Sequence, residues 1–118
     1  MEAAQSVASP LGRITIAHEA VAQIVGHTAA ECYGVVGMAA RGPRVARRLA
    51  REKLTQGISV ARGPDGIVVD LHVVVEYGLN LAEVAATVRS RVAYEVERLT
   101  GLRVARVEVH IEDVRRGT

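Results

Sequence analysis

The chain has 118 residues, 49% of them hydrophobic and 24% charged, with a formal net charge of +2. These values are typical of one globular domain and exclude a disordered chain, and apolar runs of only a few residues exclude a bilayer-spanning segment. The N-terminus lacks the pattern of a secretory signal, and the single cysteine, Cys32, cannot form an internal disulfide, so we expect a cytoplasmic protein.

The positive charge is concentrated in one segment. Residues 41–53 contain five arginines and Lys53 against Glu52, a local net charge of +5, which leaves −3 for the rest of the chain. The chain has no Trp or Phe and only three Tyr, so it is poor in the aromatic platforms on which single-stranded nucleic acids stack. The composition therefore indicates a mildly acidic body that carries one basic segment.

The chain begins with a predicted tail and a short strand. Residues 1–11 show no hydrophobic periodicity and are predicted to form a flexible N-terminal tail. Alternation in residues 13–17 predicts a strand whose Ile14 and Ile16 side chains point inward.

A helix and a second short strand are expected next. From His18 the apolar residues recur every three or four positions, which is the period of a helix. Gly34 follows this pattern and is the expected stop of the helix. Residues 34–40 are apolar and predict another short strand.

The basic segment admits two structures and three roles. Residues 41–56 form either a basic loop or a short helix, and on a helix four arginines at i, i+3, i+4 and i+7 share one face. These arginines are Arg44, Arg47, Arg48 and Arg51. The segment is either solvated, or an electrostatic contact to a protein or to anionic membrane headgroups, or a binder of nucleic-acid phosphates. The small net charge and the few aromatics disfavour the nucleic-acid role.

A hairpin follows the basic segment. Residues 58–61 alternate, residues 63–66 have the composition of a turn, and residues 67–77 alternate over a longer run. Val68 and Val74 fall on the otherwise polar face of this second strand. Either the strand is covered on both faces, or these two valines belong to a surface for a partner or for self-association.

The last elements are a long helix and a strand. Asn80 is the expected N-cap, with Glu83 three residues later, and Gly101 is the expected C-terminal stop. The inward-facing set in the strand 102–111 changes from even to odd numbers, which predicts a β-bulge near residues 105–106.

These elements predict an α+β fold in two layers. Two main helices cover one face of a small mixed sheet of about four to five strands. The domain is predicted to span residues 12–114, with the basic insertion at 41–56 and a second tail at 115–118.

Two groups of residues could carry chemistry. Cys32 could form a thiol–imidazole set with His27 or His18, but positions 27 and 32 of one helix point roughly 140° apart, so a structural cysteine is the favoured interpretation. No glycine-rich phosphate loop and no nucleophile-elbow pattern is present in the sequence.

The second group is a pair of histidines on the polar faces of two strands. His72 and His110 are flanked by Asp70, Glu108 and Glu112, so a metal site would form if the strands pair; otherwise these are ordinary surface residues. We favour the second interpretation and predict no catalytic residue, no cofactor, no metal and no small-molecule substrate.

Three blocks of the sequence resemble the bacterial alkaline-shock-protein family, also called general-stress or envelope-stress-response proteins. The first block is Gly-Arg-Ile-Thr-Ile-Ala-His-Glu-Ala-Val at 12–21 with Ala-Glu-Cys-Tyr-Gly-Val-Val-Gly at 30–37. The second block is Val-Asp-Leu-His-Val-Val-Val-Glu-Tyr-Gly at 69–78 with Leu-Ala-Glu-Val-Ala at 81–85. The third block is Val-Glu-Arg-Leu-Thr-Gly-Leu-Arg-Val with Val-Glu-Val-His-Ile, within 96–111. The resemblance covers residues 12–114, but residues 38–56 within this range fit none of the three blocks.

The resemblance implies a cytosolic protein without catalytic activity. Some members of the family self-associate and are recruited to the cytoplasmic side of the membrane by a membrane-anchored partner. We therefore expect a non-enzymatic stress protein that associates with itself and with a protein partner. The alternative is a nucleic-acid-binding or regulatory module that uses the arginine segment.

Overall fold

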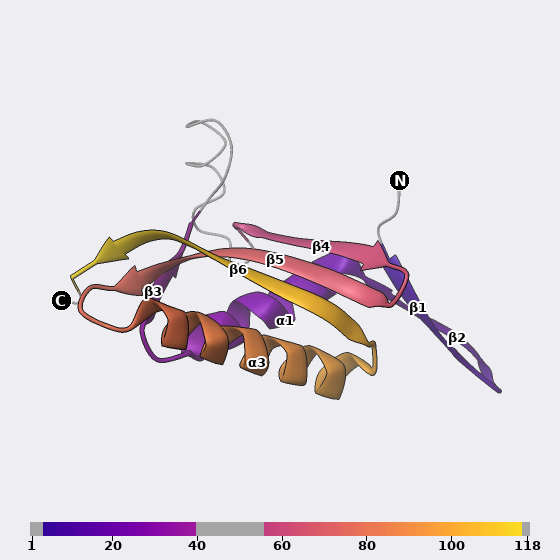
Figure 1. Cartoon of the computed structure of the whole chain (residues 1–118). Coiled ribbons are helices and arrows are strands. Elements are labelled where there is room, and N and C mark those ends of the chain that lie inside the picture. The colour runs from indigo at the N-terminus through magenta and orange to yellow at the C-terminus, as the bar shows by residue number, and fades with distance from the viewer. Residues whose placement is uncertain (1–3, 40–55, 117–118) are drawn as a thin grey trace.

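The computed structural model describes residues 4–39 and 56–116. The elements, in chain order, are β1 (Ala4–Ser9), β2 (Gly12–Ala17), α1 (His18–Glu31), β3 (Val35–Met38), β4 (Ile58–Gly63), β5 (Gly66–Glu76), α3 (Leu81–Thr100) and β6 (Val104–Arg115). Figure 1 shows a sheet with both helices on the same face and a separate β1–β2 hairpin that projects from the body. The predicted two-layer α+β architecture is confirmed.

Strand β5 is the centre of a mixed sheet. On one side it pairs in parallel with β6, and on the other it pairs antiparallel with β4 and then with β3. The β4–β5 hairpin closes at Gly63 and Gly66, where the sequence predicted the turn. The odd-numbered residues of β5, from Ile67 to Val75, are all non-polar and buried because their side chains face the helices.

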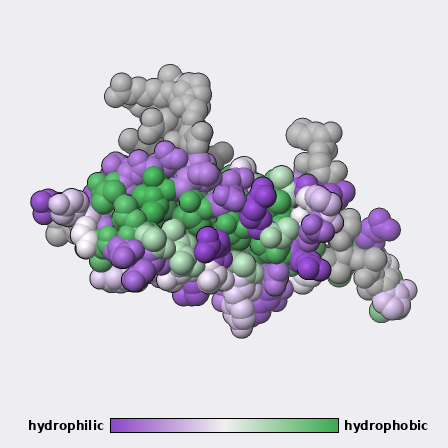
Figure 2. Space-filling model, viewed as in Figure 1, coloured by the Kyte–Doolittle hydropathy of each residue, from purple (hydrophilic) through white to green (hydrophobic). Residues whose placement is uncertain are grey.

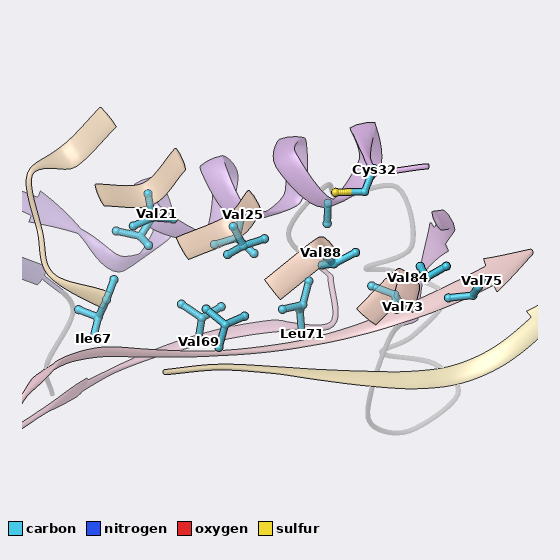
Figure 3. Packing of buried hydrophobic residues seen from close by; sticks show 14 of the residues in the cluster. Val21, Val25, Cys32, Ile67, Val69, Leu71, Val73, Val75, Val84 and Val88 are labelled. Atoms are coloured by element: carbon cyan, nitrogen blue, oxygen red, sulfur yellow. The ribbon is translucent and has the colours of Figure 1, made fainter. Parts of the chain in front are cut away.

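The core lies between β5 and the two helices. Val21 and Val25 of α1 and Val88 of α3 point toward Val69 and Leu71 of β5 (Figure 3). Valine dominates this core because the chain offers no Trp or Phe to fill it. Its branched side chains suit the pleated strand, and on the helices they form narrow stripes that pack closely on the sheet.

The ends of α3 follow the capping residues in the sequence. The Asn80 side chain accepts a hydrogen bond from the backbone N–H of Glu83 at 3.0 Å, and Gly101 adopts the left-handed conformation with φ of 77°. Both predicted boundaries are confirmed. The buried stripe of this helix is Val84, Val88, Val92 and Val96. Leu99, three residues after Val96, is 55% exposed.

Strand β6 contains two bulges. The register against β5 shifts between Val104 and Arg106, which confirms the bulge predicted from the change of parity. A second shift occurs between Ile111 and Asp113. The stretch between the two bulges pairs regularly with β5.

The N-terminal region differs from the prediction. Residues 4–9, expected within a flexible tail, form β1 and pair antiparallel with β2. Ile14 was predicted to point inward, but it is 59% exposed because the hairpin stands away from the body. Ile16 packs against the core, as expected. The basic insertion at 41–56 lies almost wholly outside the described residues, with only Gln56 inside them.

No helix in the described part of the chain is long and apolar enough to cross a membrane.

Candidate interaction surface

The face of the sheet opposite the helices carries the two histidines. His72 of β5 and His110 of β6 lie in register, and their rings stack with centroids 4.5 Å apart and planes 15° apart. The sequence predicted that these residues meet if the strands pair. The structure confirms the pairing.

Each histidine contacts a carboxylate on the neighbouring strand. His72 Nδ1 lies 2.7 Å from an oxygen of Glu112, and His110 Nε2 lies 3.2 Å from an oxygen of Asp70. The contacts are diagonal across the two strands, which aligns opposite charges when the imidazoles are protonated. Within residues 4–39 and 56–116, no group of three or more His, Cys, Asp or Glu side chains is placed to hold a metal ion. The arrangement is that of a polar cross-strand cluster.

The chain leaves the sheet after β3 and re-enters it before β4, and both points hydrogen-bond to the backbone of the same residue of β5, His72. The backbone N–H of Ala39, after β3, donates to His72 O at 2.9 Å, and His72 N–H donates to Gly57 O, before β4, at 3.0 Å. The side chain of Gln56 also donates to Met38 O at 3.2 Å. Strands β3 and β4 are therefore two halves of one edge strand, and the basic segment is inserted between them.

The predicted contact residues fall in different settings. Arg44, Arg47, Arg48 and Arg51 lie outside the described residues. Val68 is half-buried. Val74 is 3% exposed, although it is not part of the cluster beneath the helices. Its side chain is therefore covered on the outer face of the sheet, in line with a strand that is covered on both faces at this point.

The other edge of the sheet is formed by β6, which pairs with no second strand among those described. Val109 and Ile111 are half-buried there, and Val114 is 38% exposed. A groove of about 430 Å³ runs between β6 and the side of α3 that carries Ala85 and Ala93. In Figure 2 hydrophobic colour forms a band along the side of the molecule on which β6 lies. Val109 and Ile111 were predicted to lie in a strand, but the sequence did not indicate that this strand forms an edge of the sheet.

Cys32 is buried at the end of α1. Its exposed fraction is 4%, and its thiol donates to Thr28 O at 3.4 Å. Burial raises the pKa of this thiol, and the nearby Arg91 opposes part of that shift. His27, the candidate partner in a thiol–imidazole set, is exposed. A protonated, buried thiol is a weak nucleophile, so these features support a structural role.

The chain matches one known protein family over almost its whole length. The family of alkaline shock protein 23, described as having a cell envelope-related function, matches residues 6–116. The chain belongs to this alkaline shock protein family. The predicted resemblance is thereby confirmed.

Similar proteins extend over most of the chain. It is 34% identical over 107 residues to YloU of Bacillus subtilis, a match covering 88% of this chain and 89% of that protein. It is 28% identical to a stress response regulator gls24 homolog of Streptococcus pyogenes, covering 88% of this chain and 59% of that longer protein. A solved variant of the MamM CTD shares the fold, with a TM-score of 0.55, 14% identity and coverage of 85% of this chain and 95% of that one.

Proposed function

We propose that this member of the alkaline shock protein family acts without catalysis, by associating with itself and by docking to a protein partner at the cytoplasmic face of the cell envelope. The observation that carries the proposal is the open edge of the sheet at β6. There Val109 and Ile111 are half-buried, and Val109 borders a groove against α3. An unpaired edge strand offers its backbone hydrogen-bonding groups to a strand of another sheet.

The basic segment supplies the electrostatic part of the proposal. The described residues on either side of it, Ala39 and Gly57, both hydrogen-bond to the backbone of His72, and the segment 41–53 between them has a net charge of +5. Attraction to an acidic partner or to anionic headgroups would raise the rate of encounter and would weaken with salt. Arg44, Arg47, Arg48 and Arg51 are the residues proposed for this contact, and Val68 is proposed as an apolar neighbour.

The chemistry-bearing side chains support a non-enzymatic role. Cys32 is buried and held protonated, while His72 and His110 are each engaged with a carboxylate. A buried, protonated thiol is a weak nucleophile, and the imidazole–carboxylate pairs contribute to cross-strand stability and surface charge.

Reversing the four arginines to glutamate tests the electrostatic contact. We expect weaker recruitment to the membrane fraction of cells and loss of the salt dependence of the recruitment that remains. The matched control reverses four exposed arginines elsewhere: Arg13, Arg62, Arg103 and Arg116. Equal effects of the two variants, or an unchanged salt profile of the first, would contradict the proposed contact.

The second candidate function is nucleic-acid binding through the same arginines. It predicts an affinity that falls steeply with salt. A gel-shift titration of the full chain with DNA and RNA at low salt separates the two candidates. Retardation that the four-arginine variant abolishes would favour this second function, and absence of retardation would exclude it.

A further inference from the structure

The backbone of β6 presents a defined set of hydrogen-bonding groups at the open edge. His72 N–H donates toward β4, so the even-numbered residues of β5 turn their backbone groups away from β6. The odd-numbered residues, including Leu71, therefore bond to β6. Leu71 is aligned with Val109, and in a parallel ladder a residue bonds to the two neighbours of the residue aligned with it. The N–H and C=O groups of Val107, Val109 and Ile111 consequently point outward.

The sequence of β6 is also symmetric by chemical class about Val109. The residues at equal distances on either side are Glu108 and His110, Val107 and Ile111, Arg106 and Glu112, and Val104 and Val114, with Ala105 and Asp113 as the exception. The residues that the two bulges leave out of the ladder with β5 are Ala105 and Glu112. Acidic residues thus mirror basic ones, and apolar residues mirror apolar ones. A strand with this symmetry is complementary to a second copy of itself in antiparallel orientation.

We propose that β6 pairs antiparallel with β6 of a second copy, centred on Val109, so that the two sheets join into one. This inference rests on the self-association proposed above and names its interface. At the centre, Val109 faces Val109 of the second copy, and Val107 faces Ile111. These are the residues whose backbone groups point outward, so the pairing converts open donors and acceptors into ladder hydrogen bonds.

Charges on the outer face fix the register. With Val109 at the centre, Arg106 faces Glu112 of the second copy, and Glu108 faces His110. A shift of the centre to residue 108 places Glu108 opposite itself, and a shift to residue 110 places His110 opposite itself and Glu108 opposite Glu112. Centres midway between two residues place inward side chains opposite outward ones. The charges therefore favour one register over its neighbours.

The apolar side of the interface is provided by the same strand and by α3. Val109 and Ile111 are half-buried in the regular stretch, so pairing removes apolar surface from water. On the side of α3, the groove beside β6 is lined by Ala85, Arg89 and Ala93. The bulges at Ala105 and Glu112 flank the regular stretch 106–111, so the regular ladder is expected over that stretch, with Glu112 directly after its end.

Charge exchange tests the register. The single variants Arg106→Glu and Glu112→Arg each place like charges opposite one another at both ends of the proposed pairing. We expect each to dimerise about tenfold or more weakly than the wild-type chain. An equimolar mixture of the two variants restores opposite charges at both ends and is expected to form mixed dimers. Arg62→Glu on the opposite edge is the control for Arg106→Glu, with the same change of net charge.

Cysteine crosslinking tests the centre. Two residues that form a hydrogen-bonded antiparallel pair have Cα atoms about 5.5 Å apart, within the range of a disulfide. In a Cys32→Ala background, Val109→Cys is expected to form a covalent dimer on mild oxidation. Val107→Cys is expected to form one only when it is mixed with Ile111→Cys. Circular dichroism of each variant establishes that it is folded.

The outcomes separate this interface from the general proposal. A wild-type chain that stays monomeric overturns both. If the wild-type chain dimerises but Val109→Cys forms no crosslink, the β6 interface is overturned and self-association remains supported. The same conclusion follows if the charge-exchange variants dimerise as strongly as the wild-type chain. Crosslinking of Val109→Cys in cells only to a different protein also overturns it, because the edge is then used by that partner. Restored association in the mixture, together with the Val109→Cys dimer, supports it.

Discussion

Replacing Gly57 with alanine tests the junction at which the two halves of the edge strand meet. Gly57 has a φ of 74°, and a Cβ there would overlap the carbonyl oxygen of Ala39 and lie 3.3 Å from His72 O. The left-handed backbone alone costs an alanine roughly 1 kcal/mol. The overlap also forces Ala39 away from His72, which weakens two backbone hydrogen bonds of about 1 kcal/mol each. We expect a loss of about 3 kcal/mol in the free energy of unfolding.

Gly101 provides the matched control. Its φ of 77° is nearly the same, but no atom lies within 4 Å of the position of its Cβ. Gly101→Ala is therefore expected to cost only about 1 kcal/mol, the backbone part of the effect. Urea denaturation followed by circular dichroism measures both variants. Equal losses would refute the close approach between Ala39 and Gly57, and with it the description of β3 and β4 as one interrupted strand.

Three further predictions concern the core, a helix cap and the buried thiol. Leu71→Ala is expected to lower the free energy of unfolding by about 3 kcal/mol because Leu71 is fully buried, whereas Leu99→Ala, at a position 55% exposed, should cost much less; urea denaturation compares them. Asn80→Ala is expected to cost about 1 kcal/mol and Asn80→Asp much less, because aspartate retains the capping oxygen. The raised pKa of Cys32 means that the unfolded chain ionises first as the pH rises, so stability falls between the usual thiol pKa and its raised value. Thermal melts at a series of alkaline pH values should show this loss of stability in the wild-type chain and not in Cys32→Ala.

Features set by local chemistry could be predicted from the sequence. Asn80 and Gly101 mark the ends of α3 because a capping oxygen and a left-handed glycine act within one turn of the helix. The bulge near Ala105 was visible because the inward-facing residues change parity there. The same change occurs between Ile111 and Val114, so the second bulge could have been found in the same way.

Features set by pairing between distant segments could not be predicted. Nothing in residues 35–38 indicates that they form one edge strand together with residues 58–63. The two segments are joined only because each pairs with β5, which is distant from residues 35–38 in the sequence. The exposure of Ile14 depends on a hairpin that stands away from the core, and alternation alone does not reveal this. The role of β6 as an open edge likewise follows from the order of strands in the sheet and not from its own sequence.

Sedimentation velocity of the full wild-type chain measures whether the protein self-associates. One chain has a mass of 12.6 kDa. We expect the weight-average mass to rise with concentration to at least twice this value. A single species of one-chain mass over the whole concentration range would contradict it.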